Sequence, residues 1–202
     1  MTTYLDLLDY RRRVFALYAE VRSLRGSNHL GAFERWARVR DELFGSHPQS
    51  ALEPSQRATF RGLSYFPYDP SLVFLAGVVS DVGEERYEIA TSGGESTSFH
   101  RFGYVDLPVG RLEVYWLDAY GGGVFLPFRD GTSGHATYGG GRYLLDTVKG
   151  ADLGSTPDGQ LVLDFNFAYH PSCHYSARWS CPLAPPTNWL TVPIPAGERL
   201  LP

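Results

Sequence analysis

The segment Phe60-Arg61-Gly62-Leu63-Ser64-Tyr65-Phe66-Pro67 marks the point where the hydrophobic pattern of the chain changes. From Phe60 onward apolar and polar residues alternate, β-branched and aromatic residues dominate, and turn signals recur about every dozen residues. This pattern predicts strands near residues 62–67, 72–80, 86–91, 97–106, 111–118, 123–128, 142–147, 160–167 and 188–194. Because no helical pattern lies between them, the sequence favours a mainly β, antiparallel barrel-like domain or a sandwich over alternating strands and helices.

Upstream of this segment the apolar residues recur at helical spacing. Steps of three and four between residues 4 and 24 predict an amphipathic helix, and a second, shorter helix is indicated by Phe33, Trp36, Val39, Arg40 and Leu43. A brief helical turn is expected after Pro54. We therefore expect a helical segment in residues 1–59 that packs on a barrel-like domain in residues 60–202, in one structural unit. The first helix should make this contact through Leu8, Phe15, Tyr18 and Val21.

Composition and charge narrow the class of protein. The chain has 202 residues, 43% hydrophobic residues and a net charge of −4, which is typical of a packed globular unit. Its first 61 residues hold 10 Arg against 7 acidic residues, an excess too small for nucleic-acid binding. The longest apolar run, residues 72–79, is too short to cross a membrane, and no secretion signal is visible. We expect a cytoplasmic protein without nucleic-acid or membrane partners, and assembly as a homodimer stays open.

The sequence concentrates glycines, prolines and polar side chains in residues 126–198, where we expect a functional site. Arg142 follows a run of three glycines and is flanked by Tyr138 and Tyr143. Its planar guanidinium is suited to an anionic ligand, and equally to an internal ion pair with a nearby aspartate. The aspartates that could form this pair are Asp130, Asp146 and Asp164.

Two motifs in this region look like catalytic or phosphate-binding sites but have simpler interpretations. Gly139-Gly140-Gly141 precedes a predicted strand and not a helix, so a close backbone approach explains it better than a phosphate loop. Asp130, Ser133 and His135 contain the side chains of a catalytic triad within six residues, whereas working triads join distant segments. An Asx-type turn at Asp130 is the better interpretation.

Histidines and cysteines cluster between residues 170 and 181. His170, Cys173, His174 and Cys181 offer nitrogen and sulfur ligands, but they lack the short two-ligand spacing of structural zinc sites. We therefore expect no tightly held metal. A disulfide between the two cysteines is feasible, although two neighbouring thiols are favoured in a cytoplasmic protein.

Polar side chains alternate with apolar ones along the predicted strand 160–167. Asp164 and Asn166 would then lie on one inward face, where buried polar groups must be satisfied. Either a ligand or a network that holds the proline-rich loop 171–186 would satisfy them.

Several motifs together carry a family resemblance. Residues 127–143, 164–175, 181–190 and 196–198 contain Tyr-Gly-Gly-Gly-Arg-Tyr, Asp-Phe-Asn, Cys-Pro and Ala-Gly-Glu. With residues 60–67 they resemble the domain of unknown function 1684 family of bacterial and archaeal proteins. The resemblance implies a shared fold and pocket, with a split β-barrel of the flavin-binding type as an analogy, and supplies no reaction. The chain departs from the family pattern at Ala136, His170, His174 and Thr187.

Two functions remain open from the sequence. The first is a β-barrel that binds a small anionic molecule, with or without catalysis, in a pocket around Arg142. Its ligand-binding residues would be Arg142, Tyr138, Tyr143, Asp164, Asn166, Tyr169 and Asn188. The second is a non-catalytic structural or interaction protein in which these residues form an internal network. The sequence indicates no particular cofactor.

Overall fold

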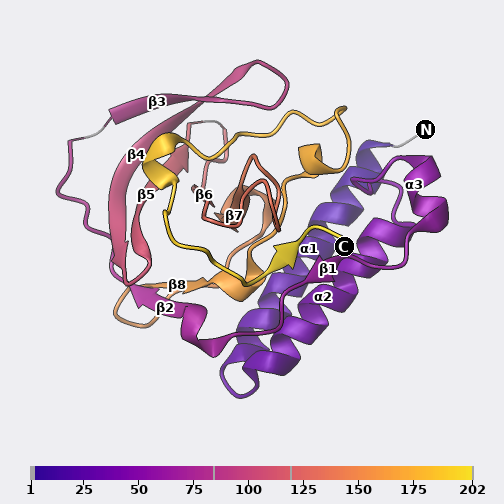
Figure 1. Ribbon diagram of the computed structural model, residues 1–202, viewed down its shortest axis with the longest axis horizontal. Coiled ribbons are helices and arrows are strands. Elements are labelled where there is room, and N and C mark those ends of the chain that lie inside the picture. Colours follow the sequence, from indigo (N-terminus) through magenta and orange to yellow (C-terminus); the bar gives the residue numbers. More distant parts are fainter. Residues whose placement is uncertain (1–2, 84, 119, 202) are drawn as a thin grey trace.

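Two long helices lie side by side along one flank of a β-rich body, as the computed structural model shows (Figure 1). The structure describes residues 3–83, 85–118 and 120–201, so the outermost residues of the predicted segments, 1, 2 and 202, lie outside it. The helices are α1 (Tyr4–Arg25), α2 (His29–Ser46) and α3 (Pro54–Thr59). The strands are β1 (Ser64–Tyr65), β2 (Val73–Ala76), β3 (Glu85–Ala90), β4 (Ser96–Leu107), β5 (Gly110–Leu117), β6 (Val124–Phe128), β7 (Arg142–Asp146), β8 (Leu161–Asp164) and β9 (Glu198–Arg199).

The strands form antiparallel sheets, which confirms the predicted mainly β, antiparallel class. Strands β3 to β7 make a five-stranded meander in chain order, while β1 pairs with β9 and β2 with β8. The pairing of β1 with β9 joins the start of the β region to the end of the chain, so the C-terminus lies beside the helices in Figure 1. This closure brings residues 190–199 under the sheet.

The predicted barrel is not confirmed, because none of these three sheets closes on itself in the described ranges. The edges of the five-stranded sheet meet the segment 169–189 only through single bridges, Tyr143 with Tyr169 and Thr91 with Pro182. Segment 171–186 contains four prolines, which lack the N–H group that a ladder needs.

The predicted strand 188–194 is wrong for a related reason. A short 3-10 turn, Pro186–Asn188, is followed by an irregular segment that contains Pro193 and Pro195. Leu190 and Ile194 still point inward as part of the main core, whereas Trp189 and Val192 are exposed. The apolar pattern therefore indicated burial at two positions, while the pairing within the described ranges is reduced to one parallel bridge between Trp189 and Arg129.

Helix α1 packs on the β-rich body through its C-terminal half. Leu17, Tyr18 and Val21 are buried with Trp36 of α2 and Phe167, in a core separate from the one under the sheet. Each such side chain, fully buried, contributes about 1.5–3 kcal/mol to stability.

Two of the four predicted contact residues of α1 remain exposed. Leu8 is 41% exposed, because the body is contacted by the other end of the helix. Phe15 is 49% exposed, although its ring covers Gly150 at the edge of the body. Among the described residues, no helix has both the length and the apolar character that a membrane crossing requires.

Candidate functional site

Arg142, the centre of the predicted anion site, lies inside the protein and is 1% exposed. Its Nη2 donates to Asp130 Oδ1 at 3.1 Å and to the Ile194 carbonyl at 2.9 Å, and its Nη1 donates to the carbonyls of Ala196 and Glu198. The Nε atom is also sealed from solvent. Of the alternatives open from the sequence, the geometry corresponds to the internal ion pair, with Asp130 as the partner.

The glycine run before Arg142 allows two backbone segments to meet. Gly141 has φ of +95°, and a Cβ atom at this position would lie 2.5 Å from the Phe128 carbonyl oxygen. Only glycine fits such a position without strain. The predicted close backbone approach is therefore confirmed, and it places Arg142 next to the C-terminal segment.

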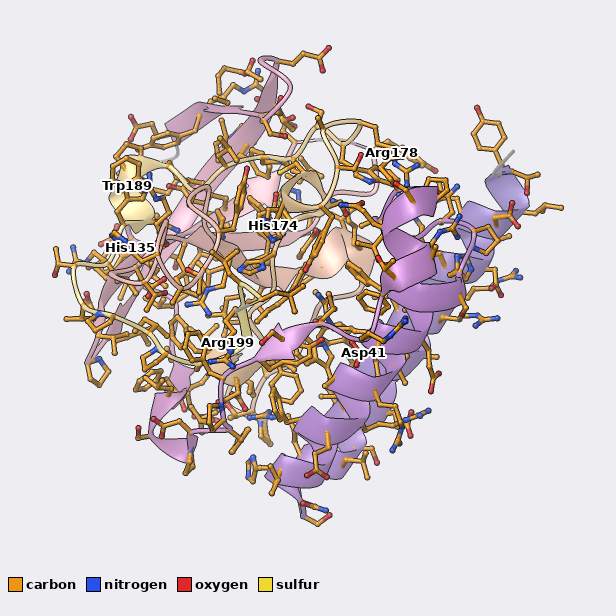
Figure 2. The ribbon with its side chains drawn as sticks, turned by 45° about the vertical axis from the view of Figure 1, so that its right-hand side comes forward. Asp41, His135, His174, Arg178, Trp189 and Arg199 are labelled. Carbon is orange, nitrogen blue, oxygen red and sulfur yellow. The ribbon has the colours of Figure 1, made fainter. Side chains whose placement is uncertain are left out.

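Asp130 forms the predicted turn. Its Oδ2 accepts hydrogen bonds from the Thr132 backbone N–H at 3.1 Å and from the Ile194 N–H at 2.7 Å. An Asx turn and an arginine partner thus account for the carboxylate. His135 is exposed, and in Figure 2 it lies with Trp189 at the side of the molecule opposite the helices, whereas Arg178 lies beside them.

Three other predicted ligand-binding residues are fully buried in local networks. Asp164 accepts from the backbone and side-chain nitrogens of Asn166, and it lies 3.4 Å from Arg25 Nη2. Asn166 in turn pairs with the backbone of Asp69 in both directions. Asn188 accepts from the Glu113 N–H and donates to two backbone carbonyls. These networks hold chain segments together, and the one at Asp164 holds residue 69 and not the loop 171–186.

Two of the three remaining predicted residues, Tyr143 and Tyr169, line a cavity of about 90 Å³ between the two long helices and the β-rich body. Its walls carry aromatic rings from both sides, including Tyr10, Tyr18 and Phe44. Two cationic side chains, Arg40 and Lys149, and the carboxylate of Asp146 supply its charge.

Arg40 lies on the apolar face of α2, held between aromatic rings. Its guanidinium carbon is 4.8 Å from the ring centre of Trp36 and 4.9 Å from that of Tyr169. Nη2 donates to Glu198 Oε2 at 2.6 Å and Nε donates to the Tyr65 hydroxyl at 3.4 Å. Burial is the largest single influence and opposes the charge, but Glu198, Tyr65 and Tyr18 together outweigh it and raise the pKa of Arg40. Within the described part of the chain, Nη1 has no hydrogen-bond partner.

The hydroxyl of Tyr169 is a second donor with no hydrogen-bond partner among residues 3–83, 85–118 and 120–201. Burial raises the pKa of Tyr169 well above its ordinary value, so the hydroxyl stays protonated at neutral pH. By contrast, the neighbouring Tyr143 hydroxyl donates to the Pro182 carbonyl at 2.6 Å. The cavity thus has two unused donors on facing walls, one from α2 and one from the body.

His170 forms part of the cavity wall next to Tyr169. Its Nε2 accepts from the Tyr138 N–H at 3.2 Å, so Nδ1 carries the proton of the neutral ring. Burial, followed by the repulsion of His174, lowers the pKa of His170 to about 2. The Glu198 carboxylate, 3.7 Å from Nδ1, opposes this shift, but it is already paired with Arg40. His170 is therefore a neutral spacer and not a general base at neutral pH.

Tyr138 and the cysteines lie beyond His170, outside the cavity lining. The Tyr138 hydroxyl is 3.9 Å from Cys173 Sγ, and its ring packs on His174 at 4.9 Å. Both cysteines are free thiols. In the described ranges, no three His, Cys, Asp or Glu side chains are grouped to hold a metal ion, and the absence of a tightly held metal stays a prediction.

Sequence reasoning missed Arg40 and Lys149 as site residues. A signal for Arg40 was present, since it occupies an apolar position of the second helix, where a charge needs a partner. Lys149 follows β7 in a 3-10 turn, and nothing in its sequence context distinguishes it from a solvated lysine.

Comparisons with known proteins agree with the motifs described above. A solved structure with the same fold is the solution NMR structure of an uncharacterised protein from gene locus rrnAC0354 of Haloarcula marismortui. It is 34% identical, covers 84% of this chain and 93% of its own, and has a TM-score of 0.58. No curated protein gives a significant match. The model of the family described as protein of unknown function (DUF1684) matches residues 58–199, and the chain therefore belongs to this family.

Proposed function

We propose that the protein binds a small carboxylate in the cavity between α1, α2 and the β-rich body. The carboxylate accepts hydrogen bonds from Arg40 Nη1 and from the Tyr169 hydroxyl. Lys149, at the edge of the cavity, adds long-range attraction. The proposal keeps the anionic ligand expected from the sequence and moves its site from Arg142 to Arg40.

The unused donors of Arg40 and Tyr169 are the observation that carries this proposal. Polar groups on a cavity wall usually find a partner, in the protein or outside it. A guanidinium and a phenol both donate hydrogen bonds, and no nitrogen of the Arg40 guanidinium can accept one. The matching partner is therefore an acceptor with negative charge. Glu198 satisfies only part of the hydrogen-bonding capacity of Arg40, since it accepts one hydrogen bond, from Nη2.

Cavity size limits the ligand. An apolar cavity of about 150 Å³ is known to hold benzene, whereas this cavity measures about 90 Å³. A short-chain carboxylate fits this volume, with its chain against the rings of Tyr18 and Phe44. With so few atoms, the dissociation constant should lie in about the millimolar range.

Titration of the protein with acetate, propionate and benzoate tests the proposal. Calorimetry and thermal melts at constant ionic strength should give binding of acetate and propionate, with chloride as the control anion. Benzoate should bind more weakly because its ring exceeds the cavity. The same response to chloride and to all three carboxylates would contradict the proposal.

The variant Tyr169→Phe locates the binding. It removes one hydroxyl that donates to a charged acceptor, so affinity should fall by about tenfold. Tyr104→Phe is the matched control, because Tyr104 lies on β4 with its ring under Arg111, away from the cavity. Equal affinities of the two variants would place the ligand elsewhere.

A non-catalytic structural or interaction role is the second candidate, and the occupancy of Arg142 favours it. Its Nη donors contact protein atoms, as do Asp164, Asn166 and Asn188. A protein in which these motif residues serve the fold alone would show no saturable response to any carboxylate in the titration above.

A further inference from the structure

Cys173 and Cys181 form a close pair that the proposed carboxylate site does not use. Cys173 lies in the short 3-10 turn Ser172–His174, and Cys181 follows after seven intervening residues. Each cysteine has the largest single effect on the pKa of the other, which makes the two thiols close neighbours. Cys173 is half-buried and can be reached from solvent, whereas Cys181 is buried.

The chain on both sides of Cys181 is fixed to the hairpin between β3 and β4. The Cys181 N–H donates to Ser92 Oγ at 3.1 Å, and its carbonyl accepts from the Ser92 N–H at 2.9 Å. Leu183 N–H donates to the Ala90 carbonyl at 3.0 Å. Cys181 therefore keeps its place while the exposed partner reacts.

The loop between the two cysteines is also anchored, to the connection between α2 and α3. Arg178 Nη2 donates to the Ser50 carbonyl at 2.6 Å, and Trp179 Nε1 donates to the Ala51 carbonyl at 3.2 Å. In Figure 2 Arg178 lies beside the helices. These bonds fix the part of the loop that leads into Cys181, so less chain entropy is lost when the neighbouring sulfur atoms bond.

The surroundings of the two sulfur atoms shift their pKa values in opposite directions. Hydrogen bonds from Cys181, Ser92 and Tyr138 outweigh burial and lower the pKa of Cys173 to about 6. The same contact with Cys173, together with burial, raises the pKa of Cys181. These two directions favour the thiolate at the accessible sulfur and the protonated thiol at the buried one. The thiolate is the reactive form of cysteine.

We propose that Cys173 and Cys181 are a thiol–disulfide exchange pair that reacts with low-molecular-weight disulfides. Cys173 is the attacking sulfur because it is the more accessible of the two and lies 3.9 Å from the Tyr138 hydroxyl. Cys181 is the resolving sulfur because it is buried directly behind the first. This inference does not rest on carboxylate binding.

The reaction balances in two steps. The Cys173 thiolate attacks one sulfur of the small disulfide, the S–S bond breaks, and one small thiolate leaves. Cys181 then attacks Cys173 Sγ, the mixed disulfide breaks, and the second small thiolate leaves with the Cys181 proton. Two electrons pass from the protein to the small disulfide, and the first thiolate takes the proton that Cys173 had released to solvent.

The order of the steps follows from the charges. While Cys173 is a thiolate, its negative charge holds the proton on Cys181. Formation of the mixed disulfide removes that charge, so Cys181 ionises more easily once the intermediate has formed. Cys181 therefore attacks only after Cys173 has formed a mixed disulfide with the external molecule.

Oxidised glutathione and intact-mass spectrometry test this inference on the wild-type protein at neutral pH. The expected product is a protein lighter by two hydrogens, with Cys173 and Cys181 joined in the peptide map and restored by dithiothreitol. Cys181→Ser should accumulate the glutathione adduct on Cys173, since serine cannot resolve it. Cys173→Ser should form adduct at least about tenfold more slowly, because a buried, protonated thiol is left.

Three results would overturn the inference. These are no internal disulfide in folded wild-type protein, equal adduct rates in the two serine variants, or stoichiometric zinc held by both thiols in the purified protein. The wild-type peptide map decides the first without any substitution. Circular dichroism of both variants confirms that their rates refer to folded protein.

Discussion

Two buried arginines, Arg142 and Arg40, differ in what surrounds them. Arg142 contacts Asp130 and three backbone carbonyls, all of them protein groups, and its side chain is fully buried. Arg40 makes one strong pair with Glu198, and its side chain remains 12% exposed at a cavity. Both have a guanidinium group, which is suited to binding anions. The difference indicates that an adjoining cavity, more than a flanking motif or an unpaired donor, identifies a binding arginine, because the buried Nε of Arg142 is also without a hydrogen-bond partner among the described residues.

Replacement of Arg142 tests the structural side of this comparison most strongly. Arg142→Met leaves the buried Asp130 carboxylate without its arginine and several carbonyls without a donor. Loss of one partner of a buried pair costs about 3–5 kcal/mol. Urea unfolding of the variant should give this loss, with no change in carboxylate binding per folded molecule.

Arg111→Met is the control for that measurement. Arg111 pairs with Asp106 on the surface, where their side chains are 57% and 59% exposed. Surface pairs contribute about 0–1 kcal/mol. A loss at Arg142 as small as the one at Arg111 would mean that Asp130 is satisfied without it, and the comparison would fail.

Arg40→Met should cost less, about 2–3 kcal/mol, because Arg40 is less deeply buried than Arg142 and Glu198 keeps a hydrogen bond from the His170 N–H. Unlike Arg142→Met, it should abolish carboxylate binding. The double variant Arg40→Met with Glu198→Gln should recover part of the stability but none of the binding. Recovery of binding in the double variant would remove Arg40 from the site.

The pH dependence of stability tests whether His170, in the cavity wall, is neutral in the folded protein. The pKa of His170 is lowered by burial to about 2 in the folded protein, against about 6.5 in the unfolded chain. Below about pH 6.5 the unfolded chain binds a proton that the folded protein does not bind, so acid favours unfolding. The loss reaches at most about 1.4 kcal/mol per pH unit between pH 6 and pH 4.

His170→Asn should flatten this part of the stability profile. Asparagine is a short polar residue that does not titrate. Urea unfolding at several pH values compares the variant with the wild type. Parallel slopes below pH 6 would mean that His170 is protonated in the fold, next to Glu198.

Periodicity predicted the local elements of this fold where burial and hydrogen bonding follow the same pattern. Helix 4–24 was predicted almost to its ends, because its apolar spacing and the Gly26 that follows it agree. Segment 188–194 was predicted as a strand from apolar residues of which Leu190 and Ile194 are buried, but its pairing in the described part of the chain is limited to one bridge at Trp189, and Pro193 lacks the N–H that a ladder needs. The Asx turn at Asp130 was predicted because it needs only local residues.

Long-range pairing could not be predicted in the same way. Three aspartates were candidate partners of Arg142, and the choice of Asp130 depends on how the turn meets the C-terminal segment. Arg40 and its partner Glu198 lie 158 residues apart. Neither residue carries a local signal for the other, so the cavity that they adjoin emerges only from the tertiary fold.

Lys149→Met should have the smallest effect on stability. It still distinguishes long-range attraction of the carboxylate from a direct hydrogen bond to it. Lys149 is 57% exposed and lies 3.5 Å from Asp146, so its loss should cost less than about 1 kcal/mol. Attraction between exposed charges is screened by salt over about 8–10 Å. Carboxylate affinity should therefore fall in this variant at low salt and converge with the wild type at high salt.

Tyr169→Phe should bind the carboxylate more weakly at every salt concentration, because it removes a direct donor. Calorimetric titrations of acetate at low and high sodium chloride compare the two variants. The same salt dependence in both would mean that Tyr169 and Lys149 act alike, and that the ligand does not enter the cavity as far as Arg40.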